Sequence, residues 1–241
     1  MTPRFFSSEQ IEPPRSEIGG SEAHHLLHVL RLGVGDRITL FDGSGAEYSA
    51  HIQSVSRDRV CCEVDEKRVT DRELGFNLQL AVALPKGDRS RWLVEKAVEL
   101  GVREIIPIEC TRSVAHVRSG SLARLGKAVI EASKQCGRNQ LAELREPISF
   151  TEWIEQEAEA AIRLVADLDP EAISLCSIDH PTSDDTVQIT IGPEGGFTKE
   201  EVAKARARAW QVVSLGHRRL RVETAALAAV AAISLWSSDS E

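Results

Sequence analysis

Hydrophobic and polar residues follow two different patterns along the chain. Within residues 1–72, apolar and polar side chains alternate in short runs, which is the period of a half-buried β-strand. Strands are predicted at residues 37–41, 48–52 and 59–64. Ser21 is placed to cap a helix that ends before Gly33, and Asp42-Gly43-Ser44-Gly45 predicts a hairpin turn. This region is predicted to be a small β-rich domain, a shape often used to hold nucleic acid.

From residue 76 onward, predicted strands alternate with predicted helices. The run at 78–84 is apolar almost throughout, as expected for a strand of a parallel sheet covered on both faces. Strands are predicted at residues 78–84, 105–108, 162–166, 187–191 and 212–215, and helices at 90–100, 121–136, 151–160, 198–209 and 224–236. This alternation predicts an α/β domain with a parallel sheet. With the charged stretch 65–73 as a linker, the predicted domains are 1–72 and 73–241.

Composition narrows the class of protein. A hydrophobic content of 42% and a charged content of 27% are ordinary for a globular protein. No apolar stretch reaches about 18 residues and the N-terminus lacks a secretion signal, so no membrane association is expected. The five cysteines lack C-x-x-C spacing, which argues against a disulfide framework and a zinc site. We therefore expect a cytoplasmic protein without a bound metal.

Charge is distributed unevenly around a net value of −8. Residues 112–145 and residues 199–221 each hold seven Lys or Arg against two acidic residues. Residues 152–185 hold ten acidic residues against one arginine. Binding to phosphate depends on the local field rather than on the total charge, so the two basic segments are compatible with RNA binding. Charged residues on solvent-exposed helix faces would explain about half of these charges, but they explain less well why the two signs are segregated along the chain.

Two glycine-bearing loops near the end of the chain suit a ligand pocket better than a core. The first, Ile191-Gly192-Pro193-Glu194-Gly195-Gly196-Phe197, has three glycines in five positions, which lets backbone approach a ligand closely. The second, residues 215–225, holds three arginines and a glutamate within six residues. Each is predicted to join a strand to a helix, where ligands bind in open α/β sheets.

These loops resemble the cofactor loops of the knotted, SPOUT-type S-adenosylmethionine-dependent RNA methyltransferases. The closest resemblance is to the family that methylates uracil N3 in bacterial 16S ribosomal RNA. Further matching segments are Pro3-Arg4-Phe5-Phe6, residues 24–31, residues 42–45, Lys86, residues 95–102, residues 111–113 and residues 131–138. Two positions depart from the family: Arg219 stands where an aliphatic residue is usual, and Ala142 falls near a usual proline.

The resemblance implies a fold and a set of partners. It implies an α/β protein with an N-terminal PUA-like RNA-binding β-barrel and a C-terminal α/β trefoil-knot (SPOUT) methyltransferase domain. It also implies S-adenosylmethionine as cofactor, 16S ribosomal RNA or the small ribosomal subunit as substrate, and a homodimer. The knot follows from the resemblance alone, because hydrophobic patterns do not reveal threading and knots are rare.

The cofactor is expected to bind among three loops that follow three strands. The backbone of the two glycine loops can surround adenine, and the end of the strand at 162–166 supplies the third side. The expected cofactor contacts are Leu164, Val165, Ala166, Asp167, Ile191, Gly192, Pro193, Glu194, Gly195, Gly196, Leu215, Gly216, Leu220, Arg221, Glu223, Thr224 and Ala225.

Arg221 and Glu223 are the candidate catalytic residues. Methylation of uracil N3 requires loss of its proton, and a nearby cation such as Arg221 stabilises the negative charge that develops. Glu223 is a candidate base, although it could instead cap the final helix or contact the cofactor. Glu194 and Glu99 are the other candidate bases, and the sequence does not decide among the three. The candidate RNA contacts are Arg4, Arg31, Lys86, Arg112, Arg138 and Arg218.

Two other classes of function compete with this interpretation. A catalytically silent RNA-binding module would use the β domain alone and would not need the intact glycine loops. A dinucleotide-binding enzyme would need G-x-G-x-x-G after the first strand of the α/β domain, where Gly87 stands alone. His24 and His28 have a spacing that can hold a metal, but packing or RNA contact is favoured because no third ligand accompanies them.

Overall fold

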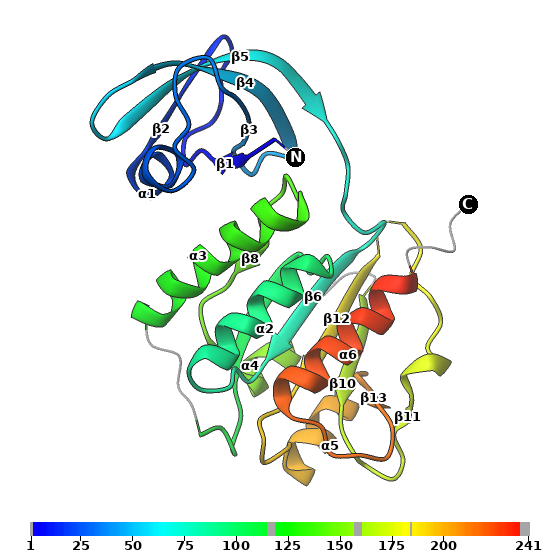
Figure 1. The fold of residues 1–241 in the computed structure, drawn as a ribbon. Helices are drawn as coiled ribbons and strands as arrows, with labels where there is room; N and C mark the ends of the chain where they lie inside the picture. Colours follow the sequence, from blue (N-terminus) through cyan, green and yellow to red (C-terminus); the bar gives the residue numbers. More distant parts are fainter. Residues whose placement is uncertain (1, 115–118, 157–160, 184, 237–241) are drawn as a thin grey trace. The chain divides into compact units, whose positions relative to one another are not determined.

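The computed structural model describes residues 2–114, 119–156, 161–183 and 185–236, and the chain divides into two compact units (Figure 1). One unit comprises Met1–Glu73 and Ser133–Leu141, and the other comprises Leu74–Ala132 and Ala142–Glu241. The sequence predicts a single boundary after residue 72. The structure adds that Ser133–Leu141, far along the chain, groups with the N-terminal unit.

The N-terminal unit is built on a five-stranded sheet with the order β1-β3-β4-β5-β2. Its strands are β1 (Arg4–Phe6), β2 (Arg15–Gly19), β3 (Arg37–Phe41), β4 (Ala46–Val55) and β5 (Arg59–Val69). β1 pairs with β3 in parallel, and the other described pairs are antiparallel. Among the described residues the two outermost strands are not paired with each other, so the sheet is a half-barrel.

The alternating pattern determines which face of this sheet is buried. Along β4, buried side chains alternate with partly exposed ones from Ala46 to Ile52, as the sequence predicts. Phe5 is fully buried and belongs to the core that these residues form. The predicted hairpin turn joins β3 to β4, and in it Gly43 and Gly45 have φ values of +84° and +94°. Only glycine adopts this conformation cheaply, which explains the two glycines of the turn.

Several elements of this unit differ from the prediction. Strand β5 continues to Val69, so most of the charged stretch 65–73 is an exposed strand rather than a linker. The predicted helix at 21–32 is a short α-helix, α1 (Gly20–His24), followed by a π-helical turn, η1 (His25–Val29). Strand β1 has three residues, which is too short for a hydrophobic period to be recognised, and strand β2 contains a single large apolar residue, Ile18.

The second unit contains an eight-stranded sheet with the order β11-β13-β10-β12-β6-β7-β8, and β9 also pairs with β7. Its strands are β6 (Asn77–Val82), β7 (Glu104–Glu109), β8 (Glu143–Leu144), β9 (Ile148–Ser149), β10 (Ala161–Ala166), β11 (Ile173–Ser174), β12 (Thr186–Ile191) and β13 (Gln211–Ser214). All described pairs are parallel, which confirms the predicted sheet type. The two-residue strands β8, β9 and β11 carry too little sequence to be predicted.

Helices cover both faces of this sheet (Figure 1). They are α2 (Asp88–Glu99), α3 (Ser119–Cys136), α4 (Phe150–Glu155), α5 (Lys199–Ala207) and α6 (Val222–Ser234). α2 and α6 pack against each other, and α4 packs against α5. The helix predicted at 151–160 ends at Glu155, and residues 157–160 lie outside the described part of the chain. No helix in the described ranges is long and apolar enough to cross a membrane.

Strand β13 enters the sheet between two strands that precede it in the chain. It pairs with β10 on one side and with β11 on the other, although only residues 167–172 connect β10 to β11. This strand order is compatible with the trefoil knot that the family resemblance implies.

Candidate functional site

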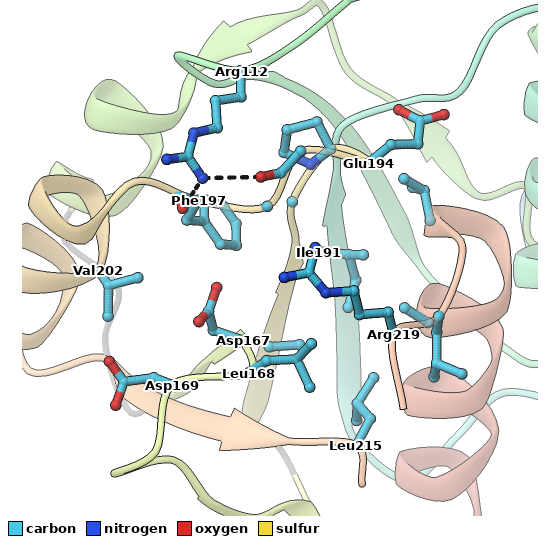
Figure 2. Close-up of a pocket in the computed structure, with 18 of the residues that line it drawn as sticks. Arg112, Asp167, Leu168, Asp169, Ile191, Glu194, Phe197, Val202, Leu215 and Arg219 are labelled. Atoms are coloured by element: carbon cyan, nitrogen blue, oxygen red, sulfur yellow. Dashed lines mark hydrogen bonds between the residues drawn. The ribbon is translucent and has the colours of Figure 1, made fainter. Parts of the chain in front are cut away.

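A cavity of about 370 Å³ opens where β10, β12 and β13 end (Figure 2). Its volume lies within the range of small-molecule sites. The parallel strands bring three loops together at one edge of the sheet: residues 167–172, 192–198 and 215–221. The lining residues are Arg112, Ala166, Asp167, Leu168, Asp169, Pro170, Ile191, Gly192, Pro193, Glu194, Gly195, Gly196, Phe197, Thr198, Lys199, Val202, Leu215, Gly216, Arg218, Arg219, Leu220, Val222 and Ala225.

The loop after β12 is held by many internal contacts. The Gly196 N–H donates to the Pro193 carbonyl at 2.8 Å. The Arg112 guanidinium donates to the carbonyls of Gly195 and Phe197 at 3.0 and 3.2 Å, as Figure 2 shows. The ring of Phe197 is buried beneath the loop. This loop therefore has a fixed shape before any ligand binds.

Glycine is required at two positions of this loop by close packing. A Cβ atom built on Gly192 would lie 2.9 Å from the Phe197 ring, and one on Gly195 would lie 3.1 Å from the Arg112 Cβ. Both distances are shorter than an ordinary van der Waals contact. The sequence analysis explained these glycines by the close approach of a ligand, whereas the close neighbours in the structure are the side chains of Phe197 and Arg112.

Helix α5 begins at the end of the same loop, and a buried carboxylate anchors it. Thr198 and Glu201 form a capping box, with the Thr198 hydroxyl accepting from the Glu201 N–H. Glu201 also accepts from the backbone N–H and the hydroxyl of Thr111, at 2.9 and 3.0 Å. These bonds place Arg112, the next residue, beside the loop that it contacts.

The loop after β13 is much less constrained. Gly216 has a φ of +104°, and its N–H donates to the Ser214 hydroxyl at 3.2 Å. Arg218, Arg219 and Arg221 are exposed, and none has an ion pair or side-chain hydrogen bond within the described residues. The Arg219 side chain points into the cavity, as Figure 2 shows. Within the described part of the chain these three arginines thus lack an internal partner, and two of them, Arg218 and Arg219, line the cavity.

The loop after β10 contributes two carboxylates. Asp169 pairs with Arg206 of α5 at 3.0 Å. The backbone N–H of Glu171, followed by this pair, holds the pKa of Asp169 below its usual value. Burial raises the pKa of Asp167, although the backbone N–H of Asp169 acts in the opposite direction. Figure 2 shows the Asp167 carboxylate directed into the cavity, opposite Arg219.

An arginine that was not a candidate from the sequence forms ion pairs with two of the candidate bases. Arg89, in the first turn of α2, approaches the Glu194 carboxylate at 3.4 Å and the Glu223 carboxylate at 3.5 Å. Glu223 is 7% exposed, and its Oε2 is buried without a hydrogen-bond partner in the described structure. Arg89 follows a single glycine that matches no known loop motif, so no sequence signal pointed to it.

This cavity fits a nucleoside that carries an amino acid. Ile191, Leu215 and Leu220 offer apolar surface for a ring, and the tightly packed glycines leave backbone groups accessible beside it. Charged side chains of both signs surround the same space. S-Adenosylmethionine combines an adenosine with a zwitterionic amino acid, so the lining residues have the chemistry to hold it.

Comparisons with known proteins identify the family. A family model described as an RNA methyltransferase domain matches residues 72–234, and one described as an RNA methyltransferase PUA domain matches residues 18–65. Ribosomal RNA small subunit methyltransferase E of Bacillus subtilis (strain 168) is 33% identical over 247 residues, covering 96% of this chain and 95% of the relative. The chain belongs to the ribosomal RNA small subunit methyltransferase E family.

Further members of the family agree over the same length. The enzyme of Rickettsia conorii is 30% identical, with 98% of this chain and 96% of the relative covered. A crystal structure of ribosomal RNA small subunit methyltransferase E from Neisseria gonorrhoeae, bound to S-adenosyl methionine, matches with a TM-score of 0.89. It is 32% identical, and 97% of each chain is covered. The SPOUT-type α/β fold with a PUA domain is confirmed.

Most of the predicted cofactor contacts lie together in this methyltransferase domain. Those that line the cavity are Ala166, Asp167, Ile191, Gly192, Pro193, Glu194, Gly195, Gly196, Leu215, Gly216, Leu220 and Ala225. Leu164 and Val165 are instead buried within β10, while Arg221, Glu223 and Thr224 lie at the start of α6 and do not line it. Strand-end reasoning therefore predicted residues that line one cavity, but it could not separate them from neighbours that do not line it.

Two of the predicted RNA contacts have partners inside the N-terminal unit. Arg138 is 3% exposed and pairs with Glu73. Arg4 pairs with Glu47 and donates to the Asn139 side chain, each at 2.8 Å. These contacts join β1 and the residues after β5 to the segment 133–141. We therefore assign both arginines a structural role, which composition alone could not reveal.

The remaining RNA candidates differ in their surroundings. Arg31, Lys86 and Arg218 are exposed, so their side chains are accessible to a ligand. Arg112 lines the cavity, but its guanidinium is directed to backbone carbonyls of the glycine loop. The sequence could not predict this contact because Arg112 and Gly195 are far apart along the chain.

The remaining candidate residues from the sequence make local contacts outside the cavity. Glu99 pairs with Lys96 of its own helix at 2.7 Å, so its carboxylate is engaged outside the cavity. The rings of His24 and His28 contact each other at 4.7 Å. Within the described ranges no cluster of three or more potential metal ligands is found.

Burial raises the pKa of both Cys62 and Cys110 to about 12, so neither thiol is poised for reaction.

Proposed function

We propose that the protein transfers a methyl group from S-adenosylmethionine to N3 of a specific uridine in 16S ribosomal RNA. The observation that carries the proposal is the three-loop cavity of the methyltransferase domain, in a chain whose relatives are ribosomal RNA small subunit methyltransferases. The matched structure from Neisseria gonorrhoeae was determined with S-adenosyl methionine bound.

The cofactor would lie against the apolar residues Ile191, Leu215 and Leu220 and the backbone of the glycine loop. When bound, S-adenosylmethionine supplies an electrophilic methyl group attached to its sulfonium sulfur. The protein contributes orientation, because holding both reactants in line can lower the barrier by about 7–11 kcal/mol. The fixed shape of the loop after β12 supports this role.

Arg221 is proposed to stabilise the negative charge that develops on the uracil ring as N3 loses its proton. Its neighbours Leu220 and Val222 both line the cavity, so the backbone of Arg221 runs along the edge of the site. The guanidinium is exposed and has no ion pair within the described structure, which leaves it available to a base. A fixed cation next to developing charge is an effective catalytic device.

The three candidate bases have different surroundings, and these support different roles. Glu194 lines the cavity and its side chain is 42% exposed, so it has the access that a proton acceptor needs. Glu223 is buried in the first turn of α6 and is bridged to Glu194 through Arg89. We propose that Glu223 positions the junction between the loop and α6, where its charge also favours the helix N-terminus. Glu99 is set aside because it pairs with Lys96.

RNA is proposed to bind through the exposed cations Arg31, Lys86 and Arg218, with the PUA domain providing recognition. Residues 1–72 hold nine Lys or Arg against twelve acidic residues, so this domain is not a general polyanion binder. Recognition by shape or by unpaired bases, which is usual for RNA-binding domains, fits this charge balance better.

A homodimer and a cytoplasmic location are also proposed, on the family resemblance. Helix α6 is apolar on more than one face, but it packs against β6, β12 and α2 of its own chain. Its composition is therefore explained without a second subunit. Light scattering at micromolar concentration tests the dimer directly, and a monomer mass would contradict it.

The activity is tested by incubating the purified protein and labelled S-adenosylmethionine with free 16S ribosomal RNA and, separately, with small ribosomal subunits. We expect label at one uridine, and reverse transcription maps it because N3-methylation blocks base pairing. The Arg221→Ala protein provides the matched control. Binding of S-adenosylmethionine without transfer to either substrate would instead support a catalytically silent RNA-binding protein.

A further inference from the structure

Two opposite charges face each other across the cavity without forming an ion pair. Asp167 extends from the loop after β10 and Arg219 extends from the loop after β13, and Figure 2 shows both side chains directed into the same space. No ion pair between them is found within the described part of the chain. The two residues are separated by a large stretch of sequence and meet only because β10 and β13 are neighbours.

The other charged side chains labelled in Figure 2 are already engaged by the protein. Arg112 donates to two backbone carbonyls, Asp169 pairs with Arg206, and Glu194 pairs with Arg89. Arg219 has no such partner among the described residues. Asp167 is partly buried, and burial raises its pKa, although the backbone N–H groups of Asp169 and Leu168 and the charge of Arg206 act in the opposite direction. Neither Arg219 nor Asp167 forms an ion pair among the described residues, and both are directed into the cavity.

We propose that Arg219 and Asp167 bind the amino-acid end of S-adenosylmethionine, Arg219 contacting the α-carboxylate and Asp167 the α-ammonium group. This inference rests on the proposed function. A guanidinium matches the two oxygens of a carboxylate in a bidentate contact, which a single point charge cannot reproduce. The same two residues would reject an anion or a cation alone, because one of the two protein charges would then face a like charge.

This assignment gives the cofactor an orientation. The amino acid lies between Asp167 and Arg219, and the adenosine lies against the apolar residues Leu215 and Leu220 on the same side of the sheet edge. The cavity then distinguishes aminoacyl thioadenosines from nucleosides that lack the amino acid. Arg219 becomes a specificity-determining residue of the cofactor site.

The test compares two ligands that differ only in this end. S-Adenosylhomocysteine carries the amino acid, whereas 5′-methylthioadenosine keeps the adenosine and the sulfur but lacks it. Calorimetry is performed with the full-length protein and its Arg219→Leu, Arg219→Lys and Asp167→Asn variants. We expect Arg219→Leu to weaken S-adenosylhomocysteine binding by roughly tenfold to a hundredfold, as for loss of a charge-assisted hydrogen bond. Affinity for 5′-methylthioadenosine should change less than about twofold, and Arg219→Lys should restore part of the loss.

Arg208→Leu is the matched control, because it removes the same charge from an exposed arginine that pairs with Glu155 and does not line the cavity. It should leave the affinity for both ligands unchanged. Equal weakening of both ligands by Arg219→Leu would show that Arg219 contacts the nucleoside and would overturn the inference. Unchanged affinity for both ligands would also overturn the inference and would indicate that Arg219 contacts RNA instead. If the wild-type protein bound neither ligand, the proposed function itself would fail.

Discussion

The two glycine loops of the cavity are built in opposite ways. The loop after β12 is held by Arg112, by the buried ring of Phe197 and by the capping box that starts α5. The loop after β13 has local hydrogen bonds between Ser214 and Gly216 at its start, and it exposes three arginines. The loop after β12 is therefore preorganised, whereas the arginines of the loop after β13 have no ion pair within the described residues.

This difference separates two tasks of the site. A fixed loop lowers the entropy lost on binding, so it suits the part of the cofactor that must be held in one position. Neighbouring arginines of like charge repel each other until an anion arrives, so they suit contacts with a carboxylate or with RNA. Elsewhere in the same basic segment, Arg206 and Arg208 are neutralised by acidic residues of the preceding stretch. Within the described residues of the segment 199–221, the arginines without an ion pair are therefore those of the loop after β13.

The largest effect is expected from filling the space within the fixed loop. Gly192→Val should abolish binding of S-adenosylmethionine, because the Cβ alone would lie 2.9 Å from the buried Phe197 ring. The loop would have to move, and overpacking of this kind costs about 1–3 kcal/mol of stability in addition. Calorimetry with S-adenosylhomocysteine measures the binding, and thermal unfolding monitors the fold.

Gly126→Ala is the control for this substitution, since a Cβ on Gly126 in α3 meets no atom within 4 Å. It should bind normally and gain about 0.5–1 kcal/mol of stability, because alanine is the better helix former. Unchanged affinity in Gly192→Val would show that the loop yields and is not preorganised.

The next effect tests the unconstrained loop. Arg221→Ala should bind the cofactor almost normally but methylate RNA about a hundredfold to a thousandfold more slowly, which corresponds to about 2.7–4 kcal/mol. Single-turnover kinetics with the RNA substrate separates the chemical step from binding. Arg221→Lys should recover only part of the rate, because a point charge cannot copy a guanidinium.

Lys204→Ala, which removes an exposed cation from α5 in the same basic segment, should keep the full single-turnover rate. Normal turnover of Arg221→Ala would remove Arg221 from the catalytic site. A loss of cofactor affinity as large as the loss of rate would place Arg221 against the cofactor instead.

The sequence predicted the preorganised loop better than the charged one. Glycine spacing, the strand before it and the Thr198–Glu201 capping box are local signals, and each is found in the structure. Arg89 and the contacts of Arg112 were not predictable, because they depend on which helix and strand become neighbours. The ion pair between Arg138 and Glu73 was not predictable for the same reason, because the two residues become neighbours only after folding.

A smaller effect is expected where Arg89 connects the two loops. Arg89→Ala should lower the free energy of unfolding by about 1–2 kcal/mol, because it leaves the Glu223 carboxylate, 10% exposed, without its cation. Glu194→Ala removes the other partner of Arg89. Because the Glu194 side chain is 42% exposed, this substitution should change the free energy of unfolding by less than about 1 kcal/mol. Urea unfolding gives both values, and a cycle with Glu223→Gln isolates the pairwise energy. Equal losses for the two single variants would mean that burial of Glu223 does not matter.

The smallest effect compares two capping boxes, only one of which borders the cavity. Thr198 caps α5 and lines the cavity, whereas Ser149 caps α4 and does not. Thr198→Ala and Ser149→Ala should each lower the free energy of unfolding by about 1 kcal/mol, since each removes one N-cap hydrogen bond. Only Thr198→Ala should also weaken S-adenosylhomocysteine binding, by less than about tenfold, because it loosens the end of the fixed loop. If both variants bound the ligand as tightly as the wild type, the order of the loop would depend on Arg112 and Phe197 rather than on the start of α5.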